Sequence, residues 1–231
     1  MNYLITGASK GIGYDTAMTL AKNPSHTILV ISRNHEGLQQ LINEAQKQTN
    51  HKNIHSKVFD IVNGDFNDLQ SWVQSFGALN GIVNNAGILI NKSFENLSKD
   101  DWTQTFATNL FGVVNLIQQL LPILEQAHII NIGSMGGYQG SSKFPGLSAY
   151  SASKAALANL TECLAEEFKD RNITVNCLAL GAVQTAMLEG AFPAYQAPVS
   201  SLQMGEWVAW FLKNGQTFFN GKVIPVSVST P

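Results

Sequence analysis

Apolar residues recur along the chain with two different periods. Short runs rich in β-branched residues are typical of strands, and they occur at Tyr3–Thr6, Thr27–Ser32, Ile54–Phe59, Gly81–Asn85, His128–Gly133, Ile173–Leu178 and Lys222–Val228. Longer stretches with helical spacing lie between them, at Ile12–Lys22, Glu36–Gln48, Asp65–Phe76, Asp100–Leu124, Ala149–Lys169 and Met204–Lys213. This alternation predicts an α/β fold, in which helices cover both faces of a doubly wound, seven-stranded parallel sheet.

The segment Gly181–Gln203 shows neither period and is rich in Ala, Pro and Gly. It follows the sixth predicted strand, and ligands of doubly wound sheets bind beyond the carboxyl ends of the strands. Long connections without regular structure are often functional, so we expect this one to border a binding site. The chain shows no repeat and no linker, which predicts a single domain over residues 1–231.

Composition excludes several partners. The formal net charge is −2, from 14 basic and 16 acidic residues, which gives no reason to expect nucleic acid. The first predicted strand begins at once, without a charged region and apolar stretch that would export the chain. We find no apolar run long enough to cross a bilayer. We therefore expect a cytoplasmic protein without membrane contact.

Cysteine and histidine residues give no pattern of a metal site or a disulfide. Cys163 and Cys177 each lie in an apolar run, so we expect two reduced thiols in the core. The five histidines form no cluster, and His51 and His55 flank the start of a strand. We expect no metal.

A glycine-rich turn follows the first predicted strand. It reads Thr6-Gly7-Ala8-Ser9-Lys10-Gly11-Ile12-Gly13, and a helix comes directly after it. Glycines at this place allow a tight turn, a close approach to a pyrophosphate, and close packing of the helix. The helix start adds N–H groups and a positive dipole end. The sequence therefore predicts a dinucleotide site formed by Gly7, Ser9, Lys10, Gly11, Ile12 and Gly13.

The spacing of these glycines and four later motifs occur in a recognisable order. Asn84-Asn85-Ala86-Gly87 closes the fourth strand, and Asn109 lies on the next helix. Ser134 ends the fifth strand, and Tyr150-Ser151-Ala152-Ser153-Lys154 opens a long helix. In this order the chain resembles the short-chain dehydrogenase/reductase family over almost its whole length. The resemblance implies a Rossmann-type oxidoreductase that transfers hydride between nicotinamide and a carbonyl or alcohol. Asn85, Ala86 and Gly87 would lie against the cofactor.

Charge at the end of the second strand bears on which cofactor binds. An NAD-selective site places an acid there, whereas this chain has Ser32 followed by Arg33, with Lys10 in the glycine-rich turn. Two cations suit a 2′-phosphate, which favours NADPH and NADP+ over NADH. Alternatively, both are solvated surface charges. The resemblance places Asp60 and Ile61 near the adenine, although Asp60 could simply cap the following helix.

Tyr150 and Lys154 share one face at the start of a helix. The reference pKa of tyrosine is about 10, and a nearby ammonium lowers it toward the working range. The resemblance makes Tyr150 the general acid and lets Lys154 also bind the nicotinamide ribose. It makes Ser134 the residue that holds the substrate oxygen, where the alternative is a serine that caps a turn. The resemblance also has Asn109 distort its helix locally and hold a water that feeds protons to Lys154, where the alternative is a structural amide bonded to neighbouring backbone.

The chain departs from the family pattern in two places. Leu180 stands where the family has proline, although Gly181, Val183 and Thr185 match the pyrophosphate-binding turn. A turn without that fixed φ angle is expected to be looser. The stretch from Ser134 to Tyr150 is longer than in the family through extra residues near Ser141–Phe144, so we expect a wider loop at the pocket mouth.

Substrate identity does not follow from these motifs. Met187, Leu188, Phe192 and Tyr195 are candidate lining residues and predict an apolar pocket for a small carbonyl or alcohol, such as a ketone or a 3-oxoacyl thioester. We expect a homodimer or homotetramer through the helices Asp100–Leu124 and Ala149–Lys169. The alternative function is a dinucleotide-sensing binding protein that has kept the fold and lost turnover.

Overall fold

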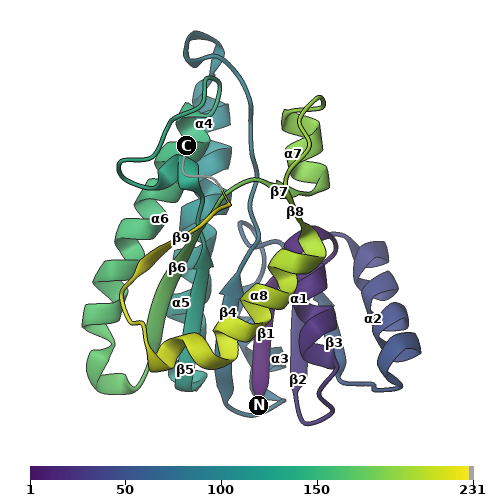
Figure 1. Ribbon diagram of the computed structural model, residues 1–231. Helices are drawn as coiled ribbons and strands as arrows, with labels where there is room; N and C mark the ends of the chain where they lie inside the picture. Colours follow the sequence, from purple (N-terminus) through teal and green to yellow (C-terminus); the bar gives the residue numbers. More distant parts are fainter. Residues whose placement is uncertain (229–231) are drawn as a thin grey trace.

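A parallel sheet of seven strands forms the centre of the computed structural model, which describes residues 1–228 (Figure 1). In sheet order the strands are β3 (Ile54–Val58), β2 (Thr27–Ser32), β1 (Asn2–Thr6), β4 (Leu79–Asn84), β5 (Leu124–Ile132), β6 (Thr174–Leu180) and β9 (Val223–Val226). All neighbouring strands run parallel. The predicted fold class is confirmed. The largest shift of a boundary is in β5, which begins at Leu124 instead of His128.

Helices cover both faces of this sheet, because successive strand residues alternate between the two faces. Ile5 of β1 packs with the helices of one face, and its neighbour Leu4 packs with those of the other. The first face carries α1 (Gly11–Ala21), α2 (His35–Thr49) and α8 (Ser201–Asn214). The second face carries α3 (Phe66–Gln74), α5 (Gly112–Leu120) and α6 (Ser148–Glu167). Burial on both faces explains why the inner strands β1, β2 and β6 are mostly apolar, whereas the edge strand β3 carries His55, Ser56 and Lys57.

The helix predicted over Asp100–Leu124 is interrupted in its middle. It begins as α4 (Lys99–Phe106), where Ser98 and Asp101 form a reciprocal pair of capping hydrogen bonds. A π-helical turn over Ala107–Phe111 follows, and α5 begins directly after it. The prediction of one continuous helix was therefore wrong. The wide turn contains Asn109, a fully buried amide whose hydrogen bonds lead out of the helix.

The same stretch corrects the prediction that no apolar run is long enough to cross a bilayer. Over Lys99–Ile123 the helix has the length and the apolar composition of a membrane span. No charged residue lies between Trp102 and Ile123. Core helices of α/β sheets pass the same test, and Val113 and Leu116 of α5 are buried against the sheet. Packing on the sheet therefore accounts for the apolar side chains of α5.

The segment Gly181–Gln203 contains three short elements. These are β7 (Val183–Gln184), α7 (Ala186–Ala191) and β8 (Val199–Ser200). β7 and β8 pair as a separate two-stranded sheet. Figure 1 shows α7 above the carboxyl ends of the main sheet, close to β7 and β8. The segment therefore borders the edge of the sheet at which ligands bind in this fold.

The two cysteines lie in different environments. Cys177 is buried in β6, whereas Cys163 is exposed on α6, and both are free thiols. The prediction of a core position was wrong for Cys163, because α6 turns Leu157 and Thr161 inward and Cys163 lies on the opposite side. Within residues 1–228, no three His, Cys, Asp or Glu side chains gather closely enough to hold a metal ion.

A buried histidine ties the sheet to α8. Nδ1 of His128 donates to the carbonyl oxygen of Leu212 at 3.1 Å, and Nε2 accepts from Nδ2 of Asn176 at 3.0 Å. Burial lowers the pKa of His128 to about 4. The neutral imidazole is therefore part of the packing between β5, β6 and α8, away from the cavity described below.

Candidate active site

A cavity of about 880 Å³ lies at the carboxyl ends of the central strands. Strand order reverses between β1 and β4, and ligands of doubly wound sheets bind at this point. Every residue predicted to bind the cofactor lines the cavity except Gly13, and every predicted catalytic residue lines it except Asn109. Motifs spread over the whole sequence therefore meet in one place.

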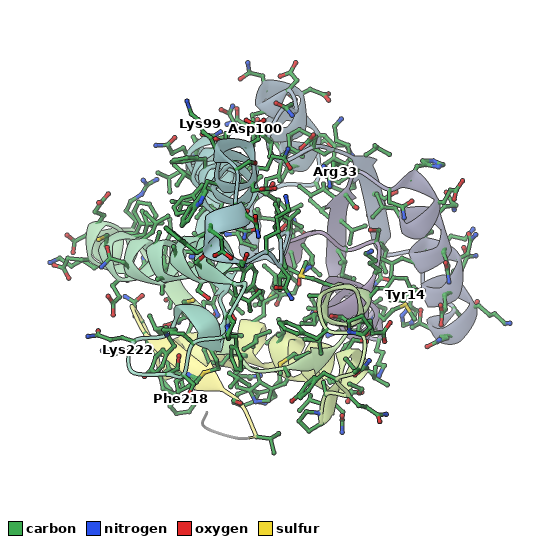
Figure 2. The ribbon with its side chains drawn as sticks, turned by 90° about the horizontal axis from the view of Figure 1, so that it is seen from above. Tyr14, Arg33, Lys99, Asp100, Phe218 and Lys222 are labelled. Atoms are coloured by element: carbon green, nitrogen blue, oxygen red, sulfur yellow. The ribbon has the colours of Figure 1, made fainter. Side chains whose placement is uncertain are left out.

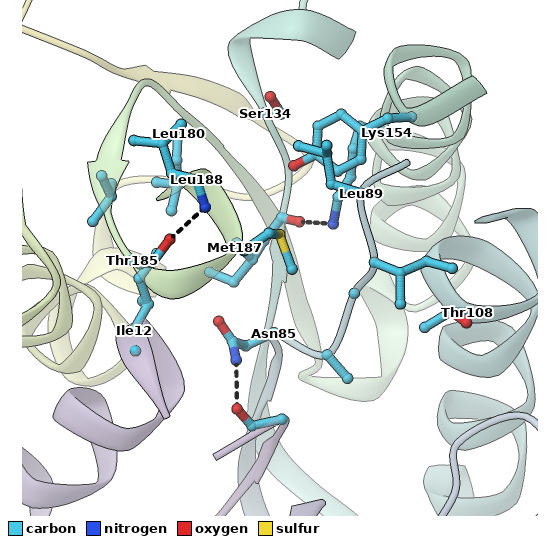
Figure 3. Close-up of a pocket in the computed structure, with 18 of the residues that line it drawn as sticks. Ile12, Asn85, Leu89, Thr108, Ser134, Lys154, Leu180, Thr185, Met187 and Leu188 are labelled. Atoms are coloured by element: carbon cyan, nitrogen blue, oxygen red, sulfur yellow. Dashed lines mark hydrogen bonds between the residues drawn. The ribbon is translucent and has the colours of Figure 1, made fainter. Parts of the chain in front are cut away.

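The glycine-rich turn after β1 is fastened to the end of β4. Oγ1 of Thr6 accepts hydrogen bonds from the N–H groups of Asn85 and Ala86, at 3.0 and 2.9 Å. Nδ2 of Asn85 donates in return to the carbonyl oxygens of Thr6 and Gly7, at 3.0 and 3.1 Å (Figure 3). Gly7 has φ +67°, and a Cβ there would lie 2.8 Å from Cα of Ala86. The two segments thus form one continuous wall, and the amide of Asn85 serves the turn itself.

The first turn of α1 presents backbone N–H groups that no side chain caps. Lys10 precedes the helix without a capping hydrogen bond, and the first turn contains no acidic residue. Gly11 and Ile12 line the cavity here, so this helix end suits a phosphate group. Gly13 lies behind them, where a Cβ would be 2.5 Å from Nδ2 of Asn85. Gly13 therefore lets the helix approach the end of β4.

Two cations lie near the end of β2. Arg33 and Lys10 are exposed and line the cavity, and Figure 2 shows Arg33 near the strand ends. None of the four ion pairs among residues 1–228 includes either cation. Oγ of Ser32 donates to Oγ of Ser9 at 2.9 Å, which joins β2 to the glycine-rich turn. Cations without a protein anion suit a phosphate group. Their exposure also fits the alternative of solvated surface charges.

Asp60 lines the cavity beside Ile61, directly after β3. Oδ1 of Asp60 accepts from the N–H of Val62 at 2.9 Å, so the carboxylate stabilises the turn after the strand. The alternative that Asp60 caps the next helix was wrong, because the side chain of Asp65 caps α3. Contact of Asp60 with adenine stays a prediction.

Ser134 and Tyr150 reach the cavity wall from different elements. Ser134 follows β5, and Tyr150 lies in the first turn of α6. Both residues line the cavity, and Ser134 lies near enough to lower the pKa of Tyr150 in part. Oγ of Ser134 accepts from the N–H of Gly136 at 3.1 Å, and its own proton stays available for an oxygen in the cavity. The longer loop between the two residues thus keeps both hydroxyls together.

Lys154 lies one helical turn after Tyr150 and is buried. Its Nζ donates to the carbonyl oxygen of Ile132 at 2.7 Å (Figure 3) and lies 5.9 Å from the centre of the Tyr150 ring. Burial lowers the pKa of Lys154 to about 8. Burial also raises the pKa of Tyr150, and Ser134 offsets this in part. The pKa of Tyr150 is thus raised and not lowered as predicted, because burial outweighs the effect of the ammonium, which donates to Ile132.

Asn109 lies behind this wall. Oδ1 of Asn109 accepts from the N–H of Ile88 at 2.9 Å, and Nδ2 donates to the carbonyl oxygen of Ile88 and to Oγ of Ser153, both at 3.0 Å. A Cβ on Gly87 would lie 3.2 Å from Oδ1 of Asn109 and 3.6 Å from Nζ of Lys154. These are the contacts of a structural amide that joins the loop after β4 to α6. A proton relay through Asn109 stays a prediction.

The turn after β6 is fixed without a proline. Leu180 is buried and lines the cavity beside Val183, and the N–H of Gly181 donates to the carbonyl oxygen of Val226 in β9 at 2.9 Å. The turn is therefore held by packing and by the neighbouring strand. The expected looseness finds no support in these contacts.

Thr185 connects this turn with the glycine-rich turn. Its Oγ1 accepts from the N–H of Leu188 at 3.3 Å and caps α7 (Figure 3). A Cβ on Gly11 would lie 3.4 Å from Cγ2 of Thr185. Thr185 thus borders the predicted pyrophosphate site while it positions the first turn of α7.

Comparison with known proteins agrees with this geometry. The family model described as short chain dehydrogenase matches residues 2–196. The chain belongs to this family.

Several relatives of this short chain dehydrogenase have a functional name or a solved structure. The 3-oxoacyl-[acyl-carrier-protein] reductase FabG of Thermotoga maritima is 32% identical over 191 residues, which are 80% of this chain and 75% of that protein. A solved short chain dehydrogenase from Burkholderia cenocepacia, in complex with NADP, is 27% identical with a TM-score of 0.85, over 99% of this chain and 96% of that one. The solved structure of a relative from Shigella flexneri, complexed with NADP, is 27% identical with a TM-score of 0.86. The match covers 97% of this chain and 95% of that one. The protein is thus an NAD(P)-dependent oxidoreductase.

Three segments that are distant in the sequence meet at the open end of the dehydrogenase cavity. They are residues 86–92 after β4, residues 138–147 before α6, and residues 185–195 around α7, and we name them the mouth segments. The N–H of Lys92 donates to the carbonyl oxygen of Gly146 at 3.0 Å. Nδ2 of Asn91 donates to the carbonyl oxygen of Ala191 at 2.9 Å. The first segment therefore holds the other two in place.

The four lining residues predicted after β6 all border the cavity, and sequence reasoning missed others. Leu89 and Leu147 also line it, and Phe144 lines it from the longer loop that was expected at the pocket mouth. Leu89 lies two residues after the Asn-Asn-Ala-Gly motif, and Leu147 lies just before the tyrosine motif. Their positions beside recognised motifs are the features that could have indicated them.

Proposed function

We propose that this protein transfers hydride between NADPH and a carbonyl or alcohol, with Tyr150 as the general acid and base. The observation that carries the proposal is that Ser134 and Tyr150 line one wall of the cavity, near enough for Ser134 to act on the pKa of Tyr150. Lys154 lies one turn behind this pair, and the cofactor motifs line the same cavity. A proton donor, a second hydroxyl and a dinucleotide site in one cavity support a redox reaction at a C–O group.

Each residue has a distinct task in this proposal. NADPH, when bound, supplies the hydride that reaches the carbonyl carbon. Tyr150 donates its proton to the carbonyl oxygen, and the resulting phenolate recovers a proton from solvent. Ser134 donates a hydrogen bond to the same oxygen and holds it beside Tyr150. The ammonium of Lys154 stabilises the phenolate, and Asn109 holds the loop after β4 against α6.

Preference for NADPH is supported by Arg33 and Lys10. Both cations line the cavity without an ion-pair partner among the described residues. A 2′-phosphate would give them that partner through charge-assisted hydrogen bonds. Two solved relatives carry NADP, which supports the same preference.

The names of the relatives indicate a candidate substrate class. The FabG proteins of Thermotoga maritima and Staphylococcus aureus are named 3-oxoacyl-[acyl-carrier-protein] reductases, and each is 32% identical to this chain. Their names support a 3-oxoacyl thioester as a candidate beside small ketones.

A dinucleotide-sensing protein without turnover is the second candidate. One observation favours it, because burial raises the pKa of Tyr150 and makes the phenolate less accessible. The departures at Leu180 and before Tyr150 no longer favour it, since the turn is anchored and the two hydroxyls converge.

The test is oxidation of NADPH with a panel of ketones, aldehydes and 3-oxoacyl thioesters, in the wild type and in Tyr150→Phe. Loss of the phenolic proton is expected to lower kcat by about 100- to 10,000-fold. The dissociation constant of NADPH should stay unchanged. Tight binding of NADPH without oxidation by any carbonyl would favour the sensor.

We propose that α4, α5 and α6 also form contacts between copies of the chain. Phe111, between α4 and α5, is 56% exposed, which suits a surface that a second copy covers. Light scattering on the purified protein measures this directly. A dimer or tetramer is expected, and a monomer at micromolar concentration would contradict it.

A further inference from the structure

The mouth segments bring no charge to the cavity. Their lining residues within the described chain include Leu89, Phe144, Leu147, Met187, Phe192 and Tyr195, and the others are also uncharged. The charged residues of the cavity wall lie elsewhere. Lys10, Arg33 and Asp60 belong to the predicted cofactor site, and the ammonium of Lys154 is engaged by the carbonyl oxygen of Ile132.

The mouth segments do carry charged side chains, and these are directed elsewhere. Lys92 forms an ion pair with Asp101 at 2.8 Å. Nζ of Lys143 donates to the carbonyl oxygen of Tyr138 at 2.6 Å. Glu189 accepts from Nε2 of Gln184 at 2.7 Å. A carboxylate or phosphate on a substrate would therefore lose its hydration in this part of the cavity without gaining a cation, which is costly.

Large apolar side chains border the mouth while still partly exposed. Phe144 is 48% exposed, Met187 is 40% exposed and Tyr195 is 50% exposed. Apolar area in a concave site is stabilised when a ligand covers it. Phe144 lies on the stretch that is longer than the family pattern. The longer loop thus adds an aromatic ring to the cavity wall.

We propose that the substrate is an uncharged carbonyl compound with a bulky apolar group beside the carbonyl, and that Phe144 is a specificity-determining residue. This inference rests on the proposed function and deepens it. The apolar group lies against the mouth segments, while the carbonyl oxygen is held at Ser134 and Tyr150.

The first test compares an uncharged ketone with its anionic counterpart. Ethyl benzoylformate and benzoylformate have the same reacting carbonyl and the same phenyl ring, and only the second is an anion. The value of kcat/KM with NADPH is expected to be at least about 100-fold higher for the ester. Equal values, or a preference for the acid, would overturn the inference.

Variants at Phe144 test the role of the ring. Phe144→Ala is expected to raise KM for the ester about 10-fold with little change in kcat. Phe144→Arg should move the ratio of ester to acid kcat/KM toward the acid by about 10-fold or more, because it supplies the missing cation. The matched control is Phe218→Ala, since Phe218 is 70% exposed and lies on the side of the molecule away from Arg33 (Figure 2). If both Phe144 variants keep the wild-type ratio and KM, Phe144 does not determine specificity.

A binding measurement separates failure of this inference from failure of the proposed function. The Tyr150→Phe variant saturated with NADPH reports binding of each compound through the fluorescence of the cofactor. Tighter binding of the ester than of the acid, without turnover by the wild type, supports the apolar pocket and overturns the reduction. Reduction of the acid as fast as the ester supports the reduction and overturns the apolar pocket.

Discussion

The two ends of the cavity are built in different ways. At the cofactor end, glycines and an uncapped helix start line the predicted phosphate site, and the side chains of Thr6 and Asn85 bond this backbone to the end of β4. At the substrate end, side chains from three distant segments form the wall, and Asn91 and Lys92 hold those segments together. Backbone geometry is insensitive to most substitutions, whereas a side-chain wall changes with each of them. The cofactor should therefore be a property of the family and the substrate a property of this chain.

Ser134, Tyr150 and Lys154 lie at the boundary between these ends. A change at the boundary should stop turnover, whereas a change at one end should weaken only the ligand of that end. The substitutions that follow test this division in order of decreasing effect.

Lys154→Met is expected to lower kcat by about 100- to 10,000-fold, because the phenolate of Tyr150 loses its ammonium neighbour. The same variant should be more stable. Burial lowers the pKa of Lys154 from 10.5 to about 8, so the folded protein binds this proton less tightly than the unfolded chain does. Removal of the buried charge should raise the free energy of unfolding at pH 7 by about 1–3 kcal/mol.

The stability gain of Lys154→Met has a defined pH dependence. The penalty for the buried ammonium is complete below about pH 8 and disappears as the pH rises to 10.5. Denaturant unfolding at pH 7 and pH 10 measures the difference, and Lys222→Met is the control at an exposed lysine. A variant that loses turnover and also unfolds more easily would show that Lys154 acts mainly as a structural residue.

Replacement of both Lys10 and Arg33 by alanine tests the cofactor end. The dissociation constant of NADPH should rise about 10- to 100-fold through the loss of charge-assisted hydrogen bonds, and that of NADH should stay the same. Isothermal titration with each cofactor gives both values. Arg171→Ala is the matched control, because Arg171 is bonded to the carbonyl oxygen of Leu121 and does not line the cavity. Equal weakening of both cofactors would mean that the cations do not select a 2′-phosphate.

Asn91→Ala tests the substrate end without touching its lining. The variant loses the hydrogen bond to Ala191 that holds the end of α7, so KM for a carbonyl substrate should rise about 3- to 10-fold. The dissociation constant of NADPH should not change. Asn96→Ala is a control, because Nδ2 of Asn96 bonds only to Ser93 nearby. Weaker NADPH binding in Asn91→Ala would show that the cofactor end and the substrate end of the cavity are not independent.

His128→Gln tests the scaffold and should have the smallest effect on function. The pKa of His128 is lowered from 6.5 to about 4, so the unfolded chain takes up this proton before the folded protein does. The wild type should lose stability as the pH falls from 6.5 to about 4, and the variant should lose less. Denaturant unfolding across this range measures the slope, and kinetics at pH 7 should be near those of the wild type. An unchanged slope would contradict the role of His128.

The sequence predicts the sheet and the cofactor end well, because both depend on short local patterns. The inner strands are mostly apolar because both faces are buried, and the glycine-rich turn must have glycine at Gly7, where φ is +67°. The local pattern predicts one continuous helix and misses the π-helical turn at Asn109, whose hydrogen bonds lead to Ile88 and Ser153 far along the chain. The family resemblance alone implied a local distortion there.

The electrostatic environment of Tyr150 and Lys154 also could not be predicted from the sequence. Spacing alone places Lys154 near Tyr150, but it does not show that the ammonium bonds to Ile132 or that burial raises the pKa of Tyr150. The place of Leu89 in the cavity wall likewise depends on how distant segments meet. Such properties follow from tertiary packing, which local patterns do not contain.

The most direct test of the account is simultaneous measurement of NADPH binding and NADPH oxidation by the wild type in the presence of ethyl benzoylformate. The cofactor should bind and be oxidised, with kcat/KM at least about 10-fold higher for NADPH than for NADH. Tight binding of NADPH without oxidation by this or any other uncharged ketone would contradict it.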